Sequence, residues 1–164
     1  MTDVRATESR RAGTRPAPKL NRRRAYSGGQ LVPVPNGLSG AVEPVAAGTN
    51  RAAVECPEVD VLAHPGLLTL EEAELAAQRG CLVEVTTRPG HSLANGHVVQ
   101  VCRQAGAPMV VDSDTHAPSD MANLAFAQTV AAGASMTPDE IALATGAHPE
   151  RLLARVLARR QQSA

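Results

Sequence analysis

The chain has 164 residues, enough for one folded domain, and its formal net charge at pH 7 is zero. It contains no Trp, one Tyr and one Phe, so any core must be built from Ala, Val and Leu. Three separated cysteines without a CxxC pair indicate neither a disulfide framework nor a zinc ribbon. No apolar run approaches the roughly 20 residues that cross a bilayer, and no signal peptide is visible, so a cytoplasmic protein is predicted.

The charge is unevenly distributed along the chain. Residues 1–24 hold eight of the sixteen basic residues and two acidic ones, so this part carries plus six and the rest minus six. The basic part also lacks hydrophobic periodicity and contains prolines. It predicts a disordered basic N-terminal arm over residues 1–42, followed by an α/β domain over 43–164. An arginine-rich, acid-poor start is also typical of an organellar transit peptide.

From residue 57 onward, strand and helix signals alternate. Short apolar runs bounded by Gly and Pro are typical of buried parallel strands. Such runs lie at residues 57–63, 81–86 and 108–112. The predicted helices cover residues 70–80, 93–105 and 120–132, and two more begin at Pro138 and Pro149. This alternation predicts parallel strands joined by right-handed crossovers. A further candidate strand at residues 31–34 adjoins prolines, which favour an edge position or no strand.

Several residues carry signals for helix starts. Thr69 and Thr137 each precede a glutamate by three residues, which is the spacing of a capping box. Ser119 is predicted to cap the helix that follows it. His97, on a predicted helix, and His148, just before one, are interpreted as surface or capping residues.

Polar side chains gather near the carboxyl end of each predicted strand. They are His64 for the first strand, Glu84, Arg88 and His91 for the second, and Asp112, Asp114 and His116 for the third. In a parallel sheet these ends lie on one rim, where ligands bind. Imidazole and carboxylate ligands together suit Zn, Mn or Fe, and a metal there could turn water into hydroxide near neutral pH. The alternative interpretation is a polar loop in which Asp114 only caps or orients its neighbours.

Four spaced segments resemble one known family. They are EPVAAGTNRAA at residues 43–53, LAHPG at 62–66, LVEVTTRPGHSLANGHV at 82–98 and VVDSDTHAPSDM at 110–121. Together they are similar to the carboxyl-terminal half of PHP-domain proteins, the polymerase and histidinol phosphatase superfamily. The small stand-alone members, which are histidinol phosphate phosphatase-like, are the most similar in these motifs.

The resemblance implies a distorted (β/α)7 barrel that hydrolyses phosphoesters with several metal ions at the carboxyl ends of its strands. By matching motifs, His64, Asp114 and His116 would be metal ligands. Arg88 and His91 would lie beside the metal as catalytic candidates, where a cation can meet the substrate phosphate or support a ligand. Without the resemblance, Arg88 is equally well interpreted as a solvated loop charge and His91 as a loop-packing histidine.

The family pattern is not complete in this chain. PHP-domain proteins begin with an HxH motif, followed by further His and Glu ligands, whereas no histidine precedes His64 here. We therefore expect a partial (β/α)7 PHP-type barrel with C-terminal strands and helices only. Such a site has few ligands, so the divalent metal could be lost through truncation and the chain alone would be weakly active or inactive.

Three functions follow from these observations. The first is a PHP-type metal-dependent phosphoesterase that acts on a phosphorylated small molecule. The second is a non-catalytic barrel remnant or interaction module that self-associates through exposed strand edges. The third is sequence-indifferent nucleic-acid binding by the basic arm, which is disfavoured because Tyr26 is the one aromatic residue near it. No membrane partner is predicted.

Overall fold

The computed structural model describes residues 45–162, which contain one sheet of three parallel strands. The strands are β1 (Val61–Leu62), β2 (Leu82–Thr86) and β3 (Met109–Asp112), in the order β1-β2-β3. Val61 pairs with Leu82, and Val83 pairs with Met109. The predicted α/β class with a parallel sheet is therefore confirmed, and the partial (β/α)7 barrel stays a prediction. The arm over residues 1–42 and the candidate strand at 31–34 lie outside the described residues.

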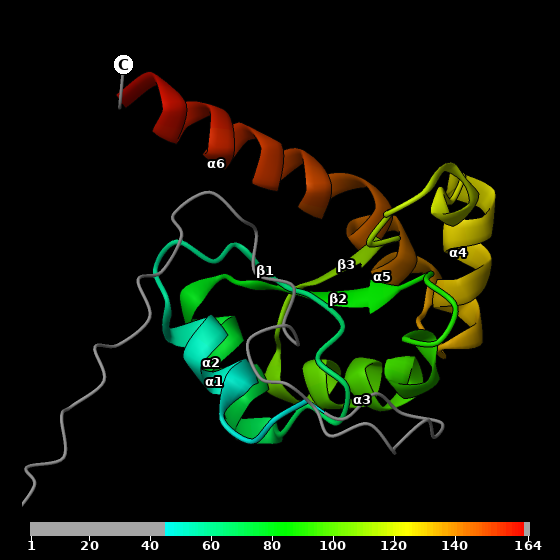
Figure 1. Cartoon of the computed structure of the whole chain (residues 1–164), viewed down its shortest axis with the longest axis horizontal. Coiled ribbons are helices and arrows are strands. Elements are labelled where there is room, and N and C mark those ends of the chain that lie inside the picture. The colour runs from blue at the N-terminus through cyan, green and yellow to red at the C-terminus, as the bar shows by residue number, and fades with distance from the viewer. Residues whose placement is uncertain (1–44, 163–164) are drawn as a thin grey trace, which may run out of the picture.

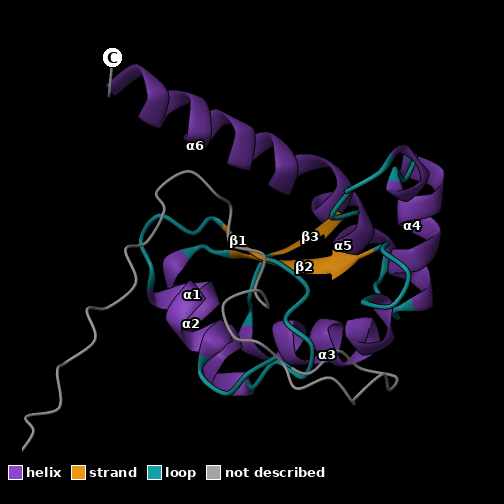
Figure 2. Cartoon of the chain, in the orientation of Figure 1, coloured by secondary structure: helices purple, strands orange, loops and turns teal. Residues whose placement is uncertain are grey.

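Helices account for most of the described chain, as Figure 2 shows. They are α1 (Thr49–Glu55), α2 (Leu70–Arg79), α3 (Asn95–Ala105), α4 (Leu124–Gly133), α5 (Pro138–Ala142) and α6 (His148–Gln162). Helices α1, α2 and α3 lie on one side of the sheet and α6 lies on the other, while α4 contacts β3 (Figure 1). None of the helices in residues 45–162 is both long enough and apolar enough to cross a bilayer.

The core lies between β2 and the helix pair α2 and α3. Val83 and Val85 of β2 are fully buried there. The side chains around them come mainly from Ala73 and Ala76 of α2 and from Val98, Val99 and Cys102 of α3. Burial of one Val side chain stabilises a fold by about 1.5 kcal/mol or more. Small side chains let the helices approach the sheet closely, so the core uses the Ala and Val that the composition supplies.

Both predicted capping boxes form. Thr69 Oγ1 accepts a hydrogen bond from the Glu72 N–H at 3.3 Å, and Glu72 Oε2 accepts one from the Thr69 N–H at 3.0 Å. Thr137 and Glu140 make the same pair of contacts at the start of α5. These reciprocal bonds satisfy backbone donors that a helix start otherwise leaves unpaired. The two helices therefore begin where the sequence predicts.

The prediction that Ser119 caps a helix over residues 120–132 is wrong. The chain first makes a short 3-10 turn, and α4 begins only at Leu124. Its cap is Asn123, whose Oδ1 accepts a hydrogen bond from the N–H of Phe126, three residues later in the first turn of α4. The physical reason is Asp120, whose carboxylate accepts two backbone N–H groups from the residues before it and thereby holds the chain in a turn.

Two helical segments of the structure were not predicted from the sequence. Helix α1 has seven residues and begins at Thr49, after Gly48, which has a left-handed φ of 84° and provides no side-chain cap. It therefore lacks the capping side chain with which α2, α4 and α5 begin. Residues Leu143–Ala147 form a π-helical segment that joins α5 to α6. Such wide turns have no simple sequence signature.

Two side chains take the place of neighbouring strands at the sheet edges. Because β1 has only two residues, Thr86 has no strand partner on that side. Asn95 fills the position, since its Oδ1 accepts from the Thr86 N–H at 3.1 Å and its Nδ2 donates to the Thr86 carbonyl at 2.8 Å. On the outer edge of β3, His148 Nδ1 donates to the Met109 carbonyl at 2.6 Å. These contacts satisfy backbone groups that a sheet edge would leave unpaired.

Candidate functional site

The carboxyl ends of the strands bring four predicted residues together around one carboxylate oxygen. His64 follows β1, Arg88 follows β2, and Asp114 and His116 follow β3. Asp114 Oδ2 lies 3.5 Å from His64 Nε2, 3.8 Å from His116 Nδ1 and 2.5 Å from Arg88 Nη1. A polar cluster with one central anion therefore stands at the rim of the sheet.

His64 and Asp114 both have left-handed backbone conformations. Their φ angles are 27° and 42°, which is uncommon for residues other than glycine. The strain is held by neighbouring groups, because the His64 N–H donates to Glu84 Oε2 at 2.6 Å. Asn50 Nδ2 also donates to the carbonyl of Pro65 at 2.9 Å. Backbone strain that the surroundings maintain is typical of functional sites.

Arg88 occupies the space between Asp114 and His116. Its Nη1 atom is 2.5 Å from Asp114 Oδ2 and 2.6 Å from His116 Nδ1. The same Nδ1 atom lies 2.7 Å from the backbone carbonyl oxygen of Asp114. A guanidinium only donates and a carbonyl only accepts, so either tautomer of His116 satisfies one of these contacts and not the other. The loop therefore has two alternative hydrogen-bonding states: His116 Nδ1 accepts from Arg88 in one and donates to the carbonyl of Asp114 in the other.

His91 reaches the cluster through the ring of His64. The two ring centroids are 4.6 Å apart and the ring planes are inclined by 48°. Both side chains are partly buried. The structure thus places His91 beside His64, a candidate ligand. This position is compatible both with a loop-packing histidine and with a catalytic candidate beside the metal.

Glu84 lies beneath the cluster and is almost completely buried, with 1% of its surface exposed. Burial raises the pKa of its carboxyl group from 4.5 to about 7, because the charged form loses hydration. The negative charges of Asp112 and Asp114 raise the pKa further, while the hydrogen bond from the His64 N–H lowers it. Oε1 of Glu84 has no hydrogen-bond partner among the described residues. Near neutral pH this side chain is therefore poised between the neutral and the charged form.

The donor atoms of the cluster are of the kinds that bind a divalent metal, but their present positions do not form a metal site. Imidazole nitrogen and carboxylate oxygen are common ligands of Zn, Mn and Fe. Within residues 45–162, however, no group of three or more His, Cys, Asp or Glu side chains is arranged to hold a metal ion. The guanidinium of Arg88 stands where Asp114 and His116 would share an ion. A metal at these two residues therefore requires the Arg88 side chain to move.

The structure places three other polar residues away from this cluster. Asp112 is exposed and accepts the N–H of the next residue. His97 contacts the carbonyl of Leu68 at 2.8 Å, and His148 donates to the edge of β3. His97 is exposed, as the surface interpretation predicts, whereas His148 is half-buried and contacts a strand instead of capping a helix. Asp112 does not join the cluster, although residues two apart share one face of an extended chain, because the left-handed backbone of Asp114, with a φ of 42°, ends the extended conformation.

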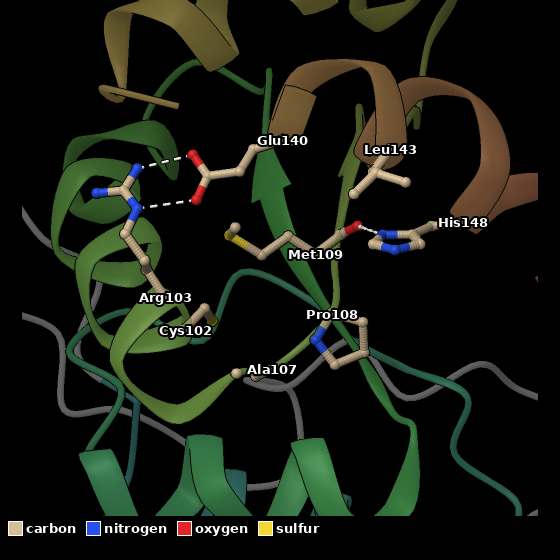
Figure 3. A pocket seen from close by; sticks show the side chains of 9 residues that line it. Cys102, Arg103, Ala107, Pro108, Met109, Glu140, Leu143 and His148 are labelled. Atoms are coloured by element: carbon tan, nitrogen blue, oxygen red, sulfur yellow. Dashed lines mark hydrogen bonds and ion pairs between the residues drawn. The ribbon is translucent and has the colours of Figure 1, made fainter. Parts of the chain in front are cut away.

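A separate pocket of about 310 Å3 lies at the amino-terminal end of β3, away from the rim cluster. Figure 3 shows Met109, Leu143 and His148 around it, and Arg103 with Glu140 at one side. Arg103 and Glu140 form a two-pronged ion pair at 2.8 Å, which ties α3 to α5. The walls of the pocket are largely apolar, and its polar groups already have partners. We therefore place the candidate site at the rim and not in this pocket.

Asn50 is a site residue that the sequence did not indicate. It belongs to α1, which has no start signal, and its contact to Pro65 depends on how that helix packs. Glu84 did carry a signal, because a single acid within the apolar run CLVEVT is unusual for a buried strand.

Comparisons with known proteins give one informative relative. The chain is 37% identical over 139 residues to an uncharacterized protein of Methanocaldococcus jannaschii. The alignment covers 85% of this chain and 63% of that protein, so the chain spans less than two thirds of the length of the curated relative it matches. No family model and no solved structure matches the chain. The chain is thus similar to a longer, uncharacterized archaeal protein.

Proposed function

We propose that the rim cluster is part of the metal centre of a PHP-type phosphoester hydrolase that acts on a phosphorylated small molecule. His64, Asp114 and His116 would hold a divalent Zn, Mn or Fe ion. The observation that supports this proposal is the meeting of three side chains around Asp114 Oδ2, at the strand ends where parallel α/β sheets bind ligands. The remaining coordination positions would be filled by water or by side chains of an associated chain.

A divalent metal at such a site makes water more acidic and polarises a phosphoryl oxygen. Arg88 now neutralises Asp114, so the Arg88–Asp114 ion pair and metal binding by Asp114 are alternatives. A guanidinium released from Asp114 is always charged and is shaped to bind two phosphate oxygens. We therefore assign Arg88 to the substrate phosphate, with Asp114 as its partner while the site is empty of substrate and metal.

Three residues would keep His64 in place for this role. Glu84 accepts the His64 N–H, Asn50 binds the carbonyl of the next residue, and His91 packs against the imidazole ring. A ligand that is held from three sides needs little ordering when a metal or substrate arrives. His91 is also near enough to the cluster to serve as a second group for the substrate phosphate.

A non-catalytic interaction module is the second candidate function. It is favoured by the position of Arg88, which fills the space between two of the proposed ligands. The archaeal relative is longer than the aligned region, so the activity of a whole protein of this kind remains part of the proposal. The two candidates differ in whether the chain binds a metal through Asp114.

Metal binding by purified protein tests the proposal directly. Mn2+ and Zn2+ are titrated calorimetrically into the wild type and into Asp114→Ala, His116→Ala and Asp112→Ala, and hydrolysis of p-nitrophenyl phosphate and histidinol phosphate is assayed on the same samples. We expect loss of Asp114 or His116 to weaken metal binding at least about tenfold. Asp112→Ala is the matched control, because it removes an exposed carboxylate from the same loop without touching the cluster.

Each outcome separates the candidates. Saturable metal binding that depends on Asp114 and His116 but not on Asp112 supports the metal centre, and hydrolysis with the same dependence supports the phosphoesterase. Absence of both metal binding and hydrolysis in the wild type supports the non-catalytic module. Equal hydrolysis by the wild type and Asp114→Ala contradicts the assigned site.

A further inference from the structure

Helix α6 rests on the domain along one side only. None of its 15 residues is fully buried. Leu152 and Val156 are half-buried on the contact side, and the guanidinium groups of Arg155 and Arg159 reach Asp60 at 3.2 and 2.5 Å. Figure 1 shows the carboxyl-terminal part of α6 extending past the strands and the other helices. Much of the helix surface is therefore open to a partner.

A second stripe of α6 has the residue spacing of a helix-pairing seam. Leu153 and Leu157 are 60% and 48% exposed, and Glu150 and Arg160 flank them in the sequence. One residue turns an α-helix by about 100°, so Leu153 points well away from Leu152 and the contact side. The steps from 150 to 153, 157 and 160 are three, four and three residues, which places all four on one face and matches the a and d positions of coiled coils.

We propose that α6 pairs antiparallel with α6 of a second copy of this chain. A two-fold axis beside residue 155 sets Leu153 of one copy opposite Leu157 of the other. The same axis sets Glu150 opposite Arg160, so the charges at both ends are complementary. A parallel pair would instead place glutamate against glutamate and arginine against arginine. The stripe is thus self-complementary in one orientation, which is what a symmetric dimer interface requires.

The charged ends of the stripe are available for this contact. Glu150 and Arg160 are exposed, and neither takes part in an ion pair within residues 45–162. Two leucines from each copy form a short apolar centre between them. One pair of 15-residue helices buries less than the roughly 1,600 Å2 of a standard stable interface. The dimer is therefore expected to be reversible and to depend on protein concentration.

Charge exchange on the full chain tests the pairing. Sedimentation velocity over about a hundredfold range of concentration should show a reversible monomer–dimer equilibrium. Glu150→Arg and Arg160→Glu each place like charges at both ends of the pair, so each should weaken dimerisation about tenfold or more. The double variant restores opposite charges and should restore the wild-type equilibrium. Leu157→Asp should leave only monomer.

Arg151→Glu is the matched control for Arg160→Glu. It makes the same change in net charge at an exposed position of α6 outside the stripe, and should leave the equilibrium unchanged. Circular dichroism of every variant checks that the exposed substitutions leave the fold intact. A wild type that stays monomeric at all concentrations overturns the proposal and leaves the stripe to another occupant. A dimer that none of the stripe variants weakens also overturns it, because the interface then lies elsewhere, for example at a strand edge.

Discussion

Replacement of Glu84 by glutamine is expected to change how the stability of the metal-free protein depends on pH. Glu84 is 1% exposed, and burial raises its pKa from 4.5 to about 7. Its Oε2 accepts the His64 N–H, while Oε1 has no hydrogen-bond partner among the described residues. Glutamine keeps the size of the side chain and an oxygen acceptor for His64, but it carries no charge at any pH.

The size of the effect follows from the pKa of the folded state. One pKa unit is worth about 1.4 kcal/mol, so a rise from 4.5 to about 7 corresponds to about 3 kcal/mol. Because the folded-state pKa of Glu84 is raised, its contribution to stability is complete below about pH 4.5 and is lost as the pH rises through about 7. Relative to Glu84→Gln, the free energy of unfolding of the wild type should fall by about 3 kcal/mol between pH 4.5 and pH 8.

Urea unfolding of both proteins at a series of pH values, with a chelator present, measures this difference. All other ionisable groups are the same in the two proteins, so subtraction of the two curves isolates the contribution of this carboxyl group. Glu74→Gln, an exposed position on α2, is the control and should follow the wild type at every pH. If the wild-type and Glu84→Gln curves run parallel, or if Glu84→Gln is the less stable protein at pH 8, then burial does not hold this carboxyl group neutral and the reasoning is refuted.

Two further substitutions test how the fold supports the rim. Asp60→Asn removes the charge that binds two arginines of α6. It should lower the free energy of unfolding by about 1 kcal/mol and speed hydrogen exchange in α6. Unchanged exchange would mean that the ion pairs do not anchor the helix. Asn95→Ala leaves the buried N–H and carbonyl of Thr86 without partners. It should lower the free energy of unfolding, measured with urea, by about 3 kcal/mol. A decrease below about 1 kcal/mol would show that water replaces the amide.

Much of the fold could be predicted because its signals are local. The capping boxes at Thr69 and Thr137 and the glycine ends of the helices depend only on neighbouring residues, and they lie where the sequence predicts. The helix predicted after Ser119 is wrong because Asp120 binds two backbone N–H groups before it and holds a turn, so the helix begins only after Asn123, and sequence spacing does not decide between these starts. The contact by which Asn95 satisfies Thr86 beside the short β1 carries no local sequence signal.

The candidate site shows the same division between local and distant information. That His64, Arg88 and Asp114 would share one rim follows from the topology of a parallel sheet. The contact of Arg88 with both Asp114 and His116 depends on side-chain directions in two loops, which no periodicity specifies. The support from Asn50 depends on the packing of a short helix without a start signal. The residues that lie at the same rim could be predicted, and the contacts between their side chains could not.

The amide of Asn95 also limits how proteins with this sheet can diverge. It occupies the donor and the acceptor that Thr86 would offer to a longer first strand. A lengthened β1 could pair with this part of β2 only after Asn95 had been displaced or replaced. The chain after β1 therefore need not continue the strand, because a residue from a different segment satisfies the backbone of β2 at Thr86. A single side chain thus allows the first strand to end after two residues while the next one continues.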